Sequence, residues 1–170
     1  PSLLDAVLLL SRLPQAACVL KAPLADSFVF GPGARLAGYI RNDWAIGMVR
    51  HSVAELRGGG QLLLFPEGTR TTRAPVNAFR GAIALIAQQA GVPVQTVFIE
   101  TDSPFLGKGW PLTRRPQLPL SYTVRLGRRF EPRRDLHAFL RELEQYYEAE
   151  LAVALEPAPP FPADVESRPA

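Results

Sequence analysis

Apolar residues along the chain follow two patterns, short continuous runs and the three-to-four-residue spacing of amphipathic helices. The continuous or alternating runs predict strands at residues 16–21, 38–41, 61–65, 94–100 and 120–126. Helical spacing predicts helices at residues 2–13, 43–57, 78–90 and 135–155, with shorter helical pieces between residues 23 and 37. Strands that alternate with helices predict an α/β domain in which helices flank a mixed sheet.

Polar and glycine residues mark the predicted helix ends. Ser2, Asp43 and Asp135 directly precede apolar stretches and are N-cap candidates. Glycines 58–60 and Gly91 supply the left-handed conformation with which helices often end. The last predicted helix carries an apolar stripe that favours packing against the rest of the domain, formed by Leu136, Phe139, Leu140, Leu143, Tyr147 and Leu151.

The length of 170 residues and the hydrophobic share of 47% predict a single globular domain. We place it at residues 1–155, because residues 156–170 are rich in Pro and Ala and predict a disordered tail. The net charge of +3 is too small to imply nucleic-acid binding. The single cysteine, Cys18, lies in an apolar stretch, which indicates an inert core thiol and excludes a disulfide framework.

The hexapeptide FPEGTR at residues 65–70 directly follows a predicted buried strand. Ligands of α/β sheets bind beyond the carboxyl ends of the strands, so a turn at this position is placed to bind an anion. The Arg70 guanidinium, the Thr69 hydroxyl and backbone N–H groups are suitable donors. A plain turn in which Glu67 and Arg70 form an ion pair is the alternative.

This hexapeptide resembles the most diagnostic motif of the glycerolipid acyltransferases of the lysophosphatidic acid acyltransferase type. The family has four sequence blocks, of which the first is Asn-His, four residues and Asp. The chain begins PSLLD, which resembles this block cut directly after its histidine. The resemblance implies that Asp5 is the catalytic aspartate, and that the histidine it orients precedes Pro1. In the family that histidine is the general base, a role that suits its titration near neutral pH.

The other three blocks resemble the family to different degrees. Residues 38–41, Gly-Tyr-Ile-Arg, are a compressed match to the second block and imply that Arg41 binds the acceptor phosphate. The third block, residues 65–70, matches in full and implies that Glu67, Gly68, Thr69 and Arg70 form the rest of the acceptor site. The fourth block keeps one of its two prolines, Pro93, and carries Gln95 at the place of the second.

Two histidines are present within the chain, His51 and His137, and neither is assigned as the base. His51 is one helical turn before Glu55, as in a solvated i,i+4 pair, and His137 has no motif near it. No group of His, Cys and acidic residues has metal-ligand spacing, so no metal is predicted. The resemblance likewise implies no cofactor, since acyl-CoA or acyl carrier protein takes part as a co-substrate.

The resemblance implies an acyltransferase of phospholipid biosynthesis that acylates the free hydroxyl of a lysophospholipid. The first expected acceptor is 1-acylglycerol-3-phosphate, and the product is then phosphatidic acid. One alternative is an acyltransferase for another lysolipid acceptor. The other is a catalytically inactive lipid-binding fragment, because the expected histidine lies outside the sequence. We expect the full protein to act at the cytoplasmic face of a membrane, attached peripherally or through a segment that precedes Pro1.

Overall fold

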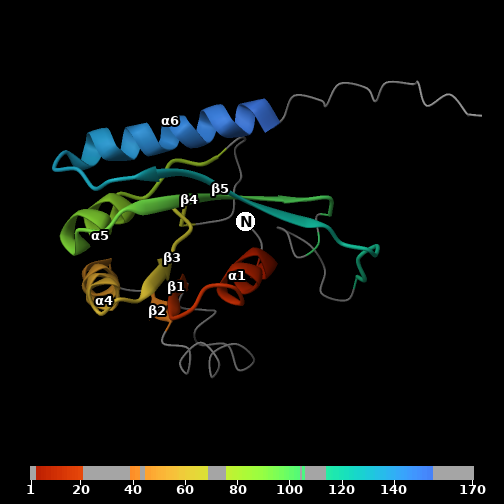
Figure 1. Ribbon diagram of the computed structural model, residues 1–170, viewed down its shortest axis with the longest axis horizontal. Coiled ribbons are helices and arrows are strands. Elements are labelled where there is room, and N and C mark those ends of the chain that lie inside the picture. Colours follow the sequence, from red (N-terminus) through yellow and green to blue (C-terminus); the bar gives the residue numbers. More distant parts are fainter. Residues whose placement is uncertain are drawn as a thin grey trace, which may run out of the picture.

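The computed structural model describes residues 3–20, 39–42, 45–68, 76–103, 105 and 114–154. In chain order the elements are α1 (Leu3–Leu10), β1 (Ala16–Leu20), β2 (Ile40–Arg41), α4 (Ala45–Arg57), β3 (Gln61–Leu63), α5 (Ala82–Ala90), β4 (Val94–Thr101), β5 (Tyr122–Phe130) and α6 (Leu136–Ala154). The described strands form a three-stranded parallel sheet, in the order β2-β1-β3, and an antiparallel pair, β4-β5. Helices flank both, so the predicted α/β class is confirmed (Figure 1).

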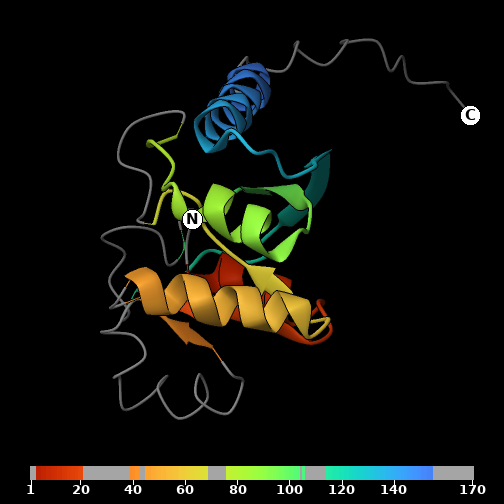
Figure 2. The ribbon, with the colours of Figure 1, turned by 90° about the vertical axis from the view of Figure 1, so that its left-hand side faces the viewer.

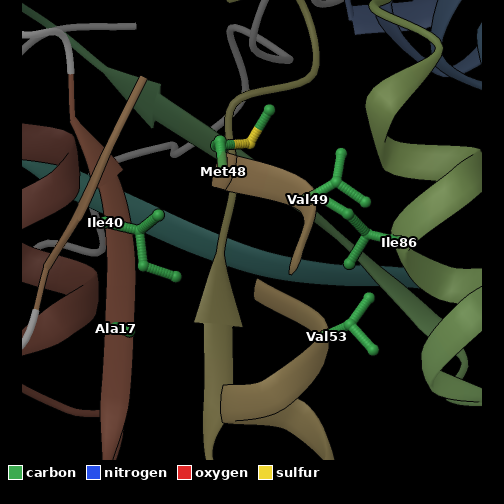
Figure 3. Close-up of a cluster of buried hydrophobic side chains, with 6 residues drawn as sticks. All are labelled: Ala17, Ile40, Met48, Val49, Val53 and Ile86. Carbon is green, nitrogen blue, oxygen red and sulfur yellow. The ribbon is translucent and has the colours of Figure 1, made fainter. Parts of the chain in front are cut away.

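The parallel sheet lies between α4 on one face and α1 on the other (Figures 1 and 2). On the face of the sheet that α4 covers, a cluster of buried apolar side chains joins strands β1 and β2 to helices α4 and α5 (Figure 3). Removing these side chains from water is the main force that attaches the helices to the sheet. The cluster consists of Ala17, Ile40, Met48, Val49, Val53 and Ile86.

A second core joins α6 to the β4-β5 pair and to α5. Phe139 and Leu143 of α6 are almost fully buried, at 1% and 0% exposure. They pack in one cluster with Phe79, Ile83, Ala84 and Phe130. Gly127 of β5 permits this close approach, since a Cβ there would stand only 2.5 Å from Thr96 Oγ1 and 2.7 Å from the Tyr146 hydroxyl. The predicted apolar stripe of the last helix is thus confirmed as its packing face.

Ion pairs add to the docking of α6 on β5. Arg128 and Arg133 both bind Glu142, at N–O distances of 2.7 and 2.8 Å, and Arg125 binds Glu150 at 2.9 Å. These side chains are partly exposed, and each such pair contributes at most about 1 kcal/mol to folding. The arginine-rich stretch around β5 is therefore partly neutralised by glutamates of the last helix.

Several predicted boundaries are wrong by a few residues. The first helix ends at Leu10 rather than residue 13, and a turn in which Gln15 has φ of 50° leads into β1. Helix α5 begins at Ala82 rather than residue 78, and the Arg80 N–H just before it bonds to the Pro66 carbonyl. Strand β5 extends past residue 126 to Phe130, since β4 continues to pair with it.

Two predicted caps are confirmed. Gly91 ends α5 at φ of 69°, and its N–H donates to the Ala87 carbonyl at 2.9 Å. Asp135 caps α6 through Oδ1, which accepts from the Ala138 N–H at 2.9 Å and so holds the pKa of Asp135 below its ordinary value. The predicted caps Ser2 and Asp43, the helical pieces at residues 23–37 and the tail at 156–170 lie outside the described residues.

Across the part of the chain that the structure describes, no helix combines the length and the apolar character that crossing a bilayer requires.

Candidate acceptor and catalytic site

The carboxyl edge of the parallel sheet brings together two of the sequence blocks. Arg41 ends β2 in register with Leu20 of β1, while Leu63 of β3 is in register with Cys18, two residues earlier in β1. Because the strands are parallel, the turn that starts at Phe65 leaves the sheet at the same edge as Arg41. Arg41 is exposed there. The second and third blocks therefore reach the same edge of the sheet, with β1 between their strands.

The turn after β3 is closed by its own backbone. The Gly68 N–H donates to the Phe65 carbonyl at 3.0 Å, and Gly68 has φ of 64°. This left-handed conformation favours glycine over any residue with a Cβ. A Cβ at Gly68 would also stand 3.2 Å from Cγ of Arg80, so the Arg80 side chain lies directly against the turn.

Glu67 is buried, at 7% exposure, and its carboxylate is used within the protein. Oε2 of Glu67 accepts a hydrogen bond from the Asn77 N–H at 3.0 Å. The Arg80 N–H donates to the Pro66 carbonyl at 2.7 Å. These two bonds hold residues 77–80 beside the turn. Thr69 and Arg70 themselves lie outside the described residues.

The last helix also holds this returning segment, which sequence analysis did not foresee. Oε1 of Glu144 in α6 accepts from the Phe79 N–H at 2.6 Å. The Tyr147 ring meets the Phe79 ring edge-on, with centroids 5.4 Å apart. Sequence alone gave no signal for this role, because Glu144 belongs to a row of glutamates on the last helix that resembles an ordinary solvated face.

Asp5 lies in the first turn of α1 and is buried, at 7% exposure. Helix α1 packs against β1 and ends at Leu10, shortly before β1 begins at Ala16 at the amino edge of the sheet. A helix of eight residues is about 12 Å long, close to the length of the strand it covers. The helix therefore runs back along β1, and its first turn, with Asp5, points toward the carboxyl edge.

The two histidines are both exposed, His51 on α4 and His137 on α6. Their exclusion from the catalytic machinery stays a prediction. No group of three or more His, Cys, Asp or Glu side chains that could hold a metal ion occurs within the described ranges.

Gln95, which takes the place of the second proline of the fourth block, forms hydrogen bonds in the structure. Gln95 lies in β4 beside a register shift, and its Nε2 donates to the Gly127 carbonyl at 2.7 Å and to the Thr96 carbonyl at 3.1 Å. An amide side chain thus bonds the irregular part of the ladder, which a proline cannot do. Gln95 accordingly has a local role in joining β4 to β5.

Cys18 is buried in β1, at 1% exposure, as predicted. Burial raises the pKa of its thiol to about 11 from an ordinary 9.0. At pH 8 the reactive thiolate is then about a hundredfold rarer than in an exposed cysteine. We expect iodoacetamide to alkylate the native chain at least that much more slowly than the chain unfolded in urea, as measured by intact mass. Equal rates in the two states would contradict the assignment of an inert core thiol.

The family model described as Acyltransferase matches residues 1–100. The crystal structure of the 1-acyl-sn-glycerophosphate (LPA) acyltransferase PlsC from Thermotoga maritima is similar in fold, with a TM-score of 0.69 at 21% sequence identity. The alignment covers 93% of this chain and 64% of that structure, so the chain spans less than two thirds of its length. No curated protein matches the chain in sequence.

Proposed function

Because the chain belongs to the Acyltransferase family, we propose that it transfers a fatty acyl group from a thioester to a lysophospholipid. The first candidate acceptor is 1-acylglycerol-3-phosphate, which gives phosphatidic acid. The donor is acyl-CoA or acyl carrier protein. The observation that carries this proposal is the closed turn beyond β3, which leaves the sheet at the same edge as Arg41. The fold similarity to an LPA acyltransferase supports the choice of acceptor.

In the proposed reaction the acceptor hydroxyl oxygen attacks the thioester carbon. The C–O ester bond forms and the C–S bond breaks, and the hydroxyl proton passes through the base to the leaving thiolate. The base is the histidine expected directly before the present first residue, and Asp5 orients it. Burial of Asp5 supports this role, because a carboxylate shielded from water orients and stabilises an imidazolium more effectively.

The proposed acceptor phosphate site combines Arg41, Gly68, Thr69 and Arg70, with Glu67 beside them. Arg41 and Arg70 supply guanidinium groups, which match a phosphate in both charge and geometry. Glu67 contributes indirectly, since its carboxylate binds the Asn77 N–H and so holds that residue beside the turn. A carboxylate used in this way does not need to face the phosphate.

The domain that carries this activity comprises residues 1–155 in our proposal, and residues 156–170 are a tail outside it. We propose that the whole protein works at the cytoplasmic face of a membrane, because its acceptor and product are both lipids. Attachment is peripheral or through an upstream segment.

The activity test uses the chain with Asn-His added before Pro1, called here the extended chain, and the 170-residue chain as its control. Thiol release from an acyl thioester is measured with lysophosphatidic acid present and absent. The extended chain should release thiol only when the acceptor is present, while the control should be inactive. Acceptor-dependent turnover at equal rates in both chains would contradict the assignment of the base. Absence of turnover with every lysolipid tried would favour a lipid-binding role.

Substitution of Arg70 by alanine tests the proposed acceptor phosphate site. In the extended chain, Arg70→Ala should lower kcat/KM for the acceptor by about ten- to a hundredfold, the effect of one lost charge-assisted contact. Arg70→Lys should recover part of this, because an ammonium group does not make the bidentate contact. The KM for the donor should stay unchanged. An Arg70→Ala variant with unaltered kinetics and a lower melting temperature would instead identify a structural ion pair.

A further inference from the structure

A guanidinium that no sequence block assigned lies against the turn after β3. Three atoms of the Arg80 side chain, Cγ, Nε and Cδ, would lie 3.2, 3.5 and 3.9 Å from a Cβ at Gly68. The absence of a side chain at Gly68 therefore makes room for the Arg80 stem to cross the turn. The inference drawn from this contact rests on the proposed function.

The backbone below this side chain is fixed at two adjacent positions. The Arg80 N–H donates to the Pro66 carbonyl, and the Phe79 N–H donates to Glu144 Oε1, at 2.7 and 2.6 Å. Arg80 is thus fastened to the turn on one side, and to α6 through its neighbour on the other. A side chain that starts from so constrained a backbone loses less entropy when it binds a ligand.

The charge of Arg80 is available to a ligand. Its side chain is exposed, and it forms no ion pair with any residue that the structure describes. Arg125, Arg128 and Arg133 differ in this respect, because each of them binds a glutamate of α6. A cation without a carboxylate partner, lying on the turn that leads into Thr69 and Arg70, is suited to bind an anion.

We propose that Arg80 contacts the acceptor phosphate and selects phosphate monoesters over phosphodiesters. A phosphate monoester carries a charge of about −1.5 to −2 near pH 7 and has three terminal oxygens. A phosphodiester head group carries a single negative charge and has two terminal oxygens. An additional guanidinium at the turn that holds Gly68 therefore stabilises the monoester more, so that Arg80 determines specificity among lysophospholipids.

Kinetics of the extended chain test this selectivity. Arg80→Ala should lower kcat/KM for lysophosphatidic acid, a monoester, by about ten- to a hundredfold. The value for lysophosphatidylglycerol, a diester, should change by less than about threefold, and the donor KM should not change. Arg141→Ala, which removes an exposed arginine from α6, is the matched control and should leave both acceptors unaffected. Equal losses for both acceptors, or an unchanged monoester value, would overturn the proposal.

A binding measurement on the 170-residue chain separates this proposal from the proposed function. Calorimetric titration with glycerol 3-phosphate, a soluble monoester, should show binding that Arg80→Ala weakens about tenfold and Arg141→Ala leaves unchanged. This result would support the Arg80 site even if the extended chain transferred no acyl group. No binding to the unsubstituted chain, or equal binding to the Arg80→Ala variant, would overturn it even if acyl transfer were demonstrated.

Discussion

Replacing Asp5 by asparagine in the extended chain is expected to lower kcat by about 10³- to 10⁴-fold. Asparagine has nearly the same shape, but it neither fixes the required histidine tautomer nor stabilises the imidazolium that forms when the base takes the hydroxyl proton. Asp5 is buried at 7% exposure in the first turn of α1, so bulk water does not substitute for the lost carboxylate. The measurement is steady-state thiol release with saturating lysophosphatidic acid.

A pH profile distinguishes this positioning role from a purely structural one. In the proposed pair a neighbouring carboxylate favours the protonated histidine, and the base is active in its neutral form. Without the carboxylate, the rise of kcat/KM with pH should therefore occur at lower pH in Asp5→Asn than in the unsubstituted chain. A variant that loses activity in proportion to its folded fraction, with an unshifted profile, would show that Asp5 only stabilises the helix.

Replacing Leu143 by alanine is expected to lower the free energy of unfolding by about 2–5 kcal/mol, as measured by urea denaturation. Leu143 is fully buried in the core that joins α6 to α5 and β5. The substitution removes buried methyl groups and leaves a cavity that the surrounding aromatic rings fill only in part. Because α6 also holds the Phe79 N–H through Glu144, acceptor kcat/KM should fall as well.

The same substitution at Leu126 provides the matched control. Leu126 of β5 is 68% exposed, so Leu126→Ala should change the unfolding free energy by no more than about 0.5 kcal/mol. Equal effects at the two positions would show that α6 does not pack as described. The family match ends at residue 100, so a large effect at Leu143 would also show that a helix beyond the match belongs to the same folding unit.

Prediction from sequence worked best where the signal is local. Asp135 and Gly91 were identified as caps because an N-cap carboxylate and a left-handed glycine act on neighbouring backbone groups. The burial of Cys18 and the apolar stripe of α6 followed from patterns that extend over a few turns or one strand. The signal that predicts each of these features comes from residues close to it in the chain.

Prediction failed where partners are distant in the chain. Helix α5 begins four residues later than its apolar pattern predicts. The segment before it is held by distant partners, since the N–H groups of Asn77, Phe79 and Arg80 bond to Glu67, Glu144 and Pro66. The N–H of Phe79 and the carboxylate of Glu144 are 65 residues apart, and no periodicity relates them.

Residue spacing and short motifs were enough to predict the α/β class, most of the elements and, through the FPEGTR hexapeptide, the family to which the chain belongs. These properties can be predicted without knowledge of the packing, because they depend on neighbouring residues in the chain. The folded structure was needed to show that Glu67 binds the Asn77 N–H, that Arg80 lies across Gly68 and that Glu144 of α6 binds the Phe79 N–H. Such contacts arise only when folding brings separate segments together, because each side chain has several possible partners and packing selects among them.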